Sequence, residues 1–170
     1  MKKGAMPIET APQSLTASEW RAAMGCFPSG VTVVTTWRGA EPVGATVNAF
    51  CSVSLEPPLL LVCLALASPA LGPIEASGVM GVNILDAGCA HLAMRFGRKP
   101  EENRFAGLGY GAVEGGAPHL EAAAVFVDCA LESAHDAGDH KILVGRGLRI
   151  SHNSAAPPLL YHRGAFPEAL

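Results

Sequence analysis

The sequence predicts a mainly β protein, an antiparallel barrel with a few peripheral helices. Segments typical of strands outnumber helical segments along the 170 residues, and turn signals recur between them at short intervals. The first sixty residues lack the regular alternation of strands and helices that a doubly wound sheet requires. The length favours one domain, which we expect at residues 16–170, behind a flexible N-terminal arm at residues 1–15.

The first half of the chain is predicted to form one helix and then a series of strands. Thr16 and Glu19 have the spacing of a capping box, so a helix should begin there and reach Phe27, where a proline and a glycine end it. β-Branched residues predict a strand at residues 31–37, which a turn at 38–42 joins to its partner. The partner and the strands after it are expected at residues 43–50, 51–55 and 59–66.

The second half of the chain is predicted to mix strands with short helical segments. A helical turn ends at Gly78, and a strand follows at residues 79–85. Asp86 is a good N-cap for a helix that reaches about Phe96. A charged loop and an irregular, glycine-rich segment are expected next, at residues 98–104 and 105–119. The last strands are expected at residues 125–131, 141–150 and 159–161.

The composition points to self-association. Hydrophobic residues make up 49% of the chain and charged residues only 16%, against a typical charged fraction of about 25%. A small monomer does not easily hide that much apolar surface, so we expect a homodimer or larger homo-oligomer. The net charge of −3 gives no general attraction for nucleic acid or for an anionic membrane, and neither is an expected partner.

The cysteines and the N-terminus predict a cytoplasmic location. Five widely spaced cysteines without a C-x-x-C pair indicate free thiols in a reducing compartment. The two lysines near the start are not followed by an apolar segment, so no signal peptide is predicted. The nine-residue apolar run LLLVCLALA is too short to span a bilayer.

Several familiar catalytic motifs are missing. Six histidines form neither H-x-H nor H-E-x-x-H, so no dedicated metal site is expected. The chain has no G-x-S-x-G and no phosphate-binding G-x-x-x-x-G-K. Residues 107–112 match the letters of a dinucleotide fingerprint, but they follow no predicted strand and precede no helix, so we interpret them as a flexible loop.

Residues 44–58 are the most informative stretch, because small and hydroxyl side chains alternate there with strand formers. Such a strand lets a flat molecule lie against its backbone, since few side chains stand in the way. Its hydroxyl and amide groups can donate hydrogen bonds to an anion. The apolar segment behind it, residues 59–67, is typical of a buried strand. We therefore interpret residues 44–58 as a ligand-binding shelf.

Two further segments can contact a nucleotide. His140 follows Asp139 at the mouth of a strand, where it can donate to a phosphate or stack on a ring; a plain surface turn capped by Asp139 is the favoured interpretation of that segment alone. Tyr161 and Arg163 lie close together after an apolar strand, and such a pair can hold a nucleotide by stacking and phosphate contact. An ordinary C-terminal strand that ends in water explains them equally well.

Taken in order, six segments resemble the short-chain flavin reductase family, which supplies the reductase components of two-component flavin-dependent monooxygenases. The resemblance runs from about Trp20 to Phe166, and its most specific parts are a Thr-x-Asn stretch that ends in Pro-Pro, a Gly-Asp-His, and a terminal Leu-Leu-Tyr-x-Arg-Gly. The matching segments are residues 29–36, 45–58, 82–85, 103–105, 138–140 and 158–164.

The resemblance implies an FMN-binding split β-barrel that dimerises, with flavin near the subunit interface. Such enzymes pass hydride from NADH or NADPH to FMN or FAD, and the reduced flavin leaves for a separate monooxygenase component. The cofactor performs this chemistry, so His140 is expected to position the nucleotide and no acid–base pair is needed. The implied flavin contacts are Thr46, Val47, Asn48, Ala49, Phe50, Ser52, Val53, Ala67, Ser68, Pro69, Arg104 and Phe105. The implied pyridine-nucleotide contacts are His140, Tyr161, His162 and Arg163.

The sequence departs from the family pattern at three places. Ala49 stands where the family often has Ser, Pro69 and Ala70 replace further hydroxyl residues, and Arg146 replaces a commonly acidic residue. Two alternatives therefore stay open. One is a flavoprotein on the same scaffold that retains FMN and reduces another acceptor, such as a corrinoid or an iron chelate. The other is a flavin-binding barrel without turnover.

Overall fold

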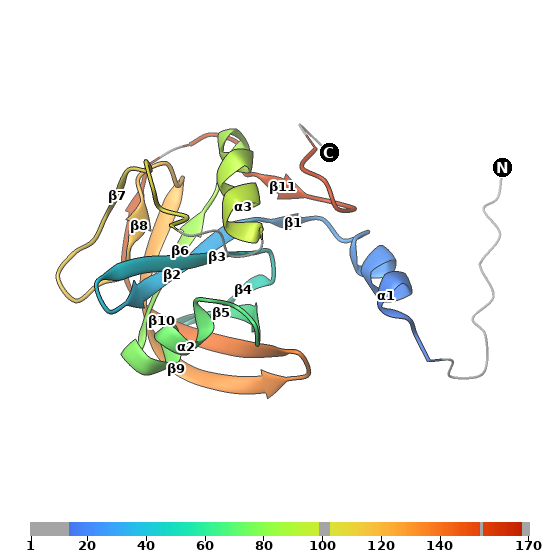
Figure 1. The fold of residues 1–170 in the computed structure, drawn as a ribbon, viewed down its shortest axis with the longest axis horizontal. Coiled ribbons are helices and arrows are strands. Elements are labelled where there is room, and N and C mark those ends of the chain that lie inside the picture. The colour runs from blue at the N-terminus through green and yellow to red at the C-terminus, as the bar shows by residue number, and fades with distance from the viewer. Residues whose placement is uncertain (1–13, 99–102, 154, 168–170) are drawn as a thin grey trace.

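The structure, a computed structural model, describes residues 14–98, 103–153 and 155–167 (Figure 1). Seven antiparallel strands form one sheet in the order β3-β2-β6-β9-β10-β5-β4. The two edge strands, β3 (Glu41–Val47) and β4 (Phe50–Leu55), are consecutive in the chain and only Asn48 and Ala49 separate them. The curled sheet therefore brings its own edges together at these two residues, and β3 also contacts β5 (Pro58–Ala65). The predicted mainly β, split-barrel fold is confirmed, and the shelf segment lies at the seam between the edges.

The predicted hairpin in the first half is present. β2 (Thr32–Arg38) pairs with β3 in a register that runs from Thr32 opposite Val47 to Arg38 opposite Glu41. The strand predicted at residues 43–50 is shorter than expected, because the pairing stops at Val47. Residues 32–36 are all buried, which shows that β2 is covered on both faces of the sheet.

Two apolar clusters cover those two faces. One fills the barrel and includes Val34, Val62 and Leu143. The other lies between the sheet and α3 (Ala90–Gly97), where Val33 packs with Phe96. α3 is thus the helix that covers the outside of the barrel next to the seam (Figure 1).

The first helix, α1 (Ala17–Met24), confirms the predicted capping box. The Glu19 backbone N–H donates to the Thr16 hydroxyl at 3.2 Å, and the Thr16 backbone N–H donates to the Glu19 carboxylate at 2.9 Å. The prediction that this helix reaches Phe27 is wrong, because Gly25 caps it. None of the eight residues of α1, all of which the structure describes, is buried, and the helix stands away from the barrel (Figure 1).

The other two caps lie where the sequence predicts them. α2 (Leu71–Ser77) ends at Gly78, whose φ of 69° is the left-handed conformation that favours glycine. Pro73 is tolerated in α2 because it lies in the first turn, where the missing N–H has no intrahelical partner. Asp86 accepts a hydrogen bond from the Gly88 N–H and opens a short 3-10 turn, η1 (Ala87–Cys89), that leads into α3.

The largest error in the predicted strands concerns β9 (Val125–Ala137) and β10 (His140–His152). They form one long hairpin, with Gly138 at a φ of 65° in its turn, whereas the sequence predicts strands only at 125–131 and 141–150. The missed segment, residues 132–137, is polar and largely exposed, so it carries no apolar alternation. Pairing with β10, and not side-chain burial, makes it a strand. β6 (Val79–Ile84) lies on the other side of β9 and matches its prediction.

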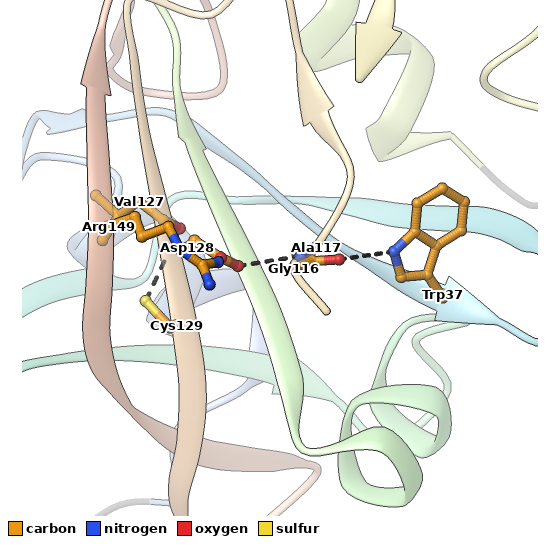
Figure 2. A network of polar contacts seen from close by, with 7 residues as sticks. All are labelled: Trp37, Gly116, Ala117, Val127, Asp128, Cys129 and Arg149. Atoms are coloured by element: carbon orange, nitrogen blue, oxygen red, sulfur yellow. Dashed lines mark hydrogen bonds and ion pairs between the residues drawn. The ribbon is translucent and has the colours of Figure 1, made fainter. Parts of the chain in front are cut away.

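The irregular segment at 105–119 is fixed to the sheet by polar side chains, of which Asp128 is buried (Figure 2). The Trp37 indole N–H donates to the Gly116 carbonyl at 2.9 Å, and Asp128 accepts from the Ala117 N–H at 3.0 Å. Arg149 donates to the same carboxylate at 2.5 Å. A two-residue ribbon, β7 (Tyr110–Gly111) with β8 (His119–Leu120), closes the segment. The excursion is therefore held rigidly despite its glycines.

The helices within the described residues lack the length and apolar character that a membrane crossing would need. The same part of the chain has no group of three or more His, Cys, Asp or Glu side chains that could hold a metal ion. Two of the N-terminal arm's expected residues, 14 and 15, are described, and the rest of that arm lies outside the described residues.

Candidate functional site

The seam of the barrel exposes backbone, as the small residues of the shelf predict. Asn48 and Ala49 are exposed, whereas Val47 turns into the core and is only 5% exposed. The Ala49 carbonyl accepts from the Cys63 N–H at 3.0 Å, and Phe50 pairs with Val62. The chain therefore crosses from one edge of the barrel to the other with the Ala49 carbonyl bonded to β5.

A cleft of about 330 Å³ opens at this seam, and we call it the seam cleft. It brings together three residues predicted to contact flavin or nucleotide, namely Thr46, Asn48 and Tyr161. Tyr161 packs on Phe166 with ring centroids 5.5 Å apart, which gives the cleft an aromatic wall. The residues that line the seam cleft are Val31, Thr46, Asn48, Ala93, Met94, Gly97, Arg98, Tyr161 and Phe166.

A short pairing that the sequence did not predict carries Tyr161 to the shelf. β1 (Ser29–Gly30) pairs with β11 (Leu160–Tyr161), with Ser29 opposite Tyr161. The Asn48 side-chain amide donates to the Ser29 hydroxyl at 3.4 Å, so Ser29 links the shelf to the C-terminal strand. Two-residue strands have no periodic pattern, which is why sequence reasoning missed this contact.

His162 and Arg163 form the turn after Tyr161. Arg163 has a φ of 52°, and its backbone N–H donates to the Gly25 carbonyl at 2.9 Å. Its guanidinium lies 3.6 Å from the Cys26 sulfur. This turn is therefore fixed to the end of α1, and neither His162 nor Arg163 is among the described residues that line the seam cleft.

His140 occupies a different position from Tyr161. It begins β10 opposite Ala65, and its Nδ1 lies 2.7 Å from an Asp139 carboxylate oxygen. The hydrogen bond to His140 holds the pKa of the Asp139 carboxyl below its usual value. The Leu66 N–H donates to the Asp139 carbonyl at 3.0 Å, which places His140 beside the segment that holds Ala67, Ser68 and Pro69. The predicted pyridine-nucleotide contacts are therefore divided: His140 lies at the end of β5, Tyr161 lines the seam cleft, and His162 and Arg163 form the turn beside the end of α1.

A larger cleft of about 940 Å³ lies between the β2–β3 hairpin and the segment that follows residue 102, and we call it the loop cleft. Pro69, Arg104 and Phe105, all predicted flavin contacts, lie among its lining residues, together with Arg38 and Tyr110. A third hollow of about 490 Å³ joins the two clefts along α3, since it shares Arg98 with the seam cleft and Arg104 with the loop cleft.

Three of the predicted contacts have side chains engaged elsewhere. The Thr46 hydroxyl donates to the Ala93 carbonyl of α3 at 2.7 Å. The Arg104 guanidinium donates to the Gly44 and Phe96 carbonyls at 2.9 and 2.8 Å, and to the Arg98 carbonyl. Phe105 is 3% exposed and packs edge-on against Phe96, with centroids 5.0 Å apart. Their roles as ligand contacts stay predictions.

The remaining predicted contacts lie on or near the edge strand. Ser52 and Val53 are exposed on β4, where the pairing with β5 is interrupted by a bulge, and Phe50 is half-buried against the core.

Arg146, one of the departures from the family pattern, has a partner of its own, because this side chain makes a two-point contact with Glu132 on β9 at 2.8 and 2.9 Å. That contact raises the pKa of Arg146 and lowers the pKa of Glu132.

Sequence reasoning missed six lining residues of the seam cleft, namely Val31, Ala93, Met94, Gly97, Arg98 and Phe166. The spacing of Ala93 and Gly97, which is predicted just past the end of the helix, was a usable signal, because residues four apart lie on the same side of a helix. An added Cβ at Gly97 would lie 3.6 Å from Thr46, which is an ordinary contact distance, so this position has room for a small side chain.

The composition of the seam cleft suits a planar heterocycle. Its walls are aromatic or aliphatic at Tyr161, Phe166 and Val31, and its few polar groups come from Asn48, Thr46 and Arg98. Pockets for cofactors are built in this way, with mostly apolar walls and a few groups that fix orientation. Ala49, exposed next to Asn48, brings no bulky side chain to the rim.

Comparison with known proteins gives a consistent family. The profile described as "Flavin reductase like domain" matches residues 24–169. The chain is 36% identical over 156 residues to the flavin-dependent monooxygenase reductase subunit HsaB of Rhodococcus jostii, a match that covers 92% of this chain and 80% of that protein. It is 40% identical over 161 residues to the FMN reductase (NADH) RutF of Agrobacterium fabrum, with 94% and 91% of the two chains covered.

Solved structures give the same result. The nitrilotriacetate monooxygenase component B of Mycobacterium thermoresistibile superposes with a TM-score of 0.83 at 35% identity, over 88% of this chain and 84% of that one. The NADH:FAD oxidoreductase of Streptomyces globisporus, solved in complex with NAD and FAD fragments, gives a TM-score of 0.82 at 33% identity, over 88% and 90%.

Proposed function

This chain belongs to the flavin reductase-like domain family, and we propose that it is an NAD(P)H:flavin oxidoreductase that supplies reduced FMN or FAD to a partner monooxygenase. Residues 16–170 form its functional domain in this proposal. The main structural support for this function is the seam cleft, which is lined by Thr46 and Asn48 of the shelf and by Tyr161 of the C-terminal strand. Segments that are far apart in the sequence thus form one cleft suited to a flat ligand.

Bound flavin supplies the hydride acceptor, and the protein supplies orientation. The Asn48 amide can hydrogen bond to the polar edge of the ring, and the backbone of Ala49 borders it without steric hindrance. Backbone N–H groups at the seam stabilise negative charge that arrives on the ring, because they are fixed in place before the reaction. The Tyr161–Phe166 wall excludes water from one side of the cleft.

The nicotinamide nucleotide is held by His140 and the turn at Tyr161, His162 and Arg163. His140 is half-exposed and its Nδ1–H donates to Asp139, so its Nε2 can accept from a nucleotide amide or, in the protonated ring, donate to a phosphate. His140 acts here as a positioning residue, since hydride transfer between two cofactors needs no protein acid or base.

The active species is a homodimer. α1 has eight residues, whereas isolated helices shorter than about 12–15 residues are marginal in water, so a partner surface is needed to hold it. Its apolar side chains face solvent, with Trp20 55% and Phe27, just beyond its end, 79% exposed. Leu148 and Ile150 of β10, 55% and 64% exposed, offer an apolar surface on a second copy.

Two measurements test this assembly. Light scattering coupled to size exclusion should give twice the chain mass for the wild type, and Trp20→Glu should shift the protein toward the monomer. A wild type that elutes as a monomer at micromolar concentration would contradict the proposal.

The five cysteines, all free, and the use of a nicotinamide nucleotide support a cytoplasmic location.

The activity is tested by a steady-state matrix of NADH and NADPH against FMN and FAD. Enzyme at substoichiometric concentration should turn over many equivalents of at least one pairing. Absence of nicotinamide oxidation with all four pairings would overturn the proposal. Protein that purifies with bound flavin, and whose rate of nicotinamide oxidation does not rise when flavin is added, would instead support a flavoprotein that reduces another acceptor.

A further inference from the structure

Two side chains tie α3 to the edge strand β3 beside the seam cleft. The Thr46 hydroxyl donates to the Ala93 carbonyl at 2.7 Å, in the middle of the helix. Arg104 reaches the end of the helix, where its guanidinium donates to the Phe96 carbonyl at 2.8 Å and to the Gly44 carbonyl of β3 at 2.9 Å. Both ties therefore connect the same helix to the same strand.

The end of α3 needs the Arg104 tie because the helix has no glycine cap. Its C-cap is Arg98, in an extended conformation, so the last carbonyls lack the hydrogen bonds that a left-handed cap provides. Arg104 donates to the Arg98 and Phe96 carbonyls in place of that cap, and its positive charge faces the negative end of the helix dipole.

Helix α3 lies so close to strand β3 that a side chain at Gly44 would be crowded. A Cβ at this position would lie 3.1 Å from the Phe96 ring and 3.0 Å from the Val34 carbonyl. Gly44 thus allows α3 to lie close to β3, and the two ties hold it there. Ala93 and Gly97 of α3 line the seam cleft together with Thr46 and Asn48, and the Thr46 hydrogen bond joins the helix and the strand into one continuous wall, so the position of α3 sets the shape of that wall.

The Thr46 tie also limits what Thr46 can offer a ligand. A hydroxyl has one proton to donate, and here that proton goes to Ala93, so the oxygen faces the cleft only as an acceptor. Thr46 therefore cannot donate its hydroxyl proton to flavin while its hydrogen bond to Ala93 is in place.

We infer that Thr46 and Arg104 are positioning residues, which fix α3 against β3 and so set the shape of the wall against which the flavin ring lies. The inference rests on the proposed function for the identity of the ligand, whereas the fixing of α3 is a property of the free protein. It can therefore be tested without turnover.

The first test is hydrogen–deuterium exchange of the α3 amides in the ligand-free protein. Thr46→Val is nearly isosteric and removes the donor, and it should speed exchange in α3 about fivefold, as expected for the loss of one net hydrogen bond of about 1 kcal/mol. Thr46→Ser keeps the hydroxyl and should stay within twofold of the wild type. Arg104→Lys keeps the charge but loses the planar fork, and it should speed exchange at the end of α3 by a similar factor.

Ser52→Ala is the matched control, since Ser52 lies on β4 and is predicted to contact flavin from outside the α3 tie. It should leave α3 exchange unchanged. In steady-state assays, Thr46→Val and Arg104→Lys should raise the flavin KM five- to tenfold with kcat within threefold, because a displaced wall binds the ring less well without altering the reaction of the bound ring.

Unchanged α3 exchange in both Thr46→Val and Arg104→Lys would overturn the inference, whatever happens to the flavin KM. A fall in kcat at unchanged KM would also overturn it, because it would place Thr46 on the reacting ring. If the wild type has no flavin turnover, the proposed function fails, and the exchange experiment still decides whether the two side chains fix α3.

Discussion

Asp128 is predicted to be one of the most important polar side chains for stability, and Asp128→Ala tests that prediction. The carboxylate is 1% exposed and accepts from the Ala117 N–H at 3.0 Å and from Arg149 at 2.5 Å (Figure 2). Ala117 is itself 1% exposed, so its N–H cannot turn to water when the acceptor is removed. The substitution therefore leaves a buried donor unpaired and detaches the segment at 116–117 from β9.

The cost follows from these contacts. A buried donor without a partner costs about 1–3 kcal/mol, and the small cavity left by the carboxylate adds to it. The Arg149 side chain is 52% exposed and can return to water, so the ion pair itself adds little. We expect a loss of about 2–4 kcal/mol in the free energy of unfolding, which for a chain of this size lowers Tm by about 4–16 °C.

The assay is urea unfolding at one fixed protein concentration, because dissociation of a dimer would otherwise shift the midpoint. Asp128→Asn should lose less, since its side-chain oxygen can still accept from Ala117. Arg146→Gln is the surface control: it removes a pair whose side chains are 45% and 40% exposed, and should cost under about 1 kcal/mol. An Asp128→Ala variant as stable as this control would refute the reasoning.

Three more predictions concern the site and the thiols. His140→Ala should raise the KM for the nicotinamide nucleotide about tenfold and leave flavin binding unchanged; equal losses of both would show that His140 is misplaced. Tyr161→Ala should weaken substrate binding about tenfold, whereas Tyr161→Phe keeps the aromatic wall and should stay within threefold; similar losses in both variants would contradict a role for the ring. Burial raises the pKa of the Cys129 thiol to about 12, from 9.0 for an ordinary thiol. Above pH 9 the unfolded chain loses this thiol proton, whereas the native state keeps it. The contribution of the buried thiol to the free energy of unfolding is therefore fully present below pH 9 and is lost as the pH rises toward 12. Cys129→Ala, unfolded with urea under reducing conditions, should show a shallower loss over that range; an identical slope would contradict the assignment.

Much of the fold could be predicted because its signals are local. The β-branched run that forms β2 and the capping residues Thr16, Gly78 and Asp86 act within a few residues of themselves. The errors share another cause. Residues 132–137 of β9 and the β1–β11 pair have no apolar pattern of their own and exist because another strand pairs with them, the neighbouring β10 in the first case and a strand near the other end of the chain in the second.

The candidate site, like the fold, could be predicted only where its signals are local. The small residues at Thr46–Ala49 predict the exposed shelf, and Tyr161 lies beside it as expected of one site. Sequence letters cannot tell which way a side chain points, however, and Phe105 turns into the core while Arg104 donates to backbone carbonyls. Arg98 and Phe166 reach the cleft only through the packing of α3 and the C-terminal turn, which no spacing in the sequence encodes.

The central claim is that the seam of the barrel receives the flavin ring, and a crystal structure of the protein with bound flavin tests it most directly. We predict that the ring lies in the seam cleft, against the backbone of Asn48 and Ala49 and within contact distance of Tyr161. A ring seated in the loop cleft, with the seam cleft filled only by solvent, would contradict the account.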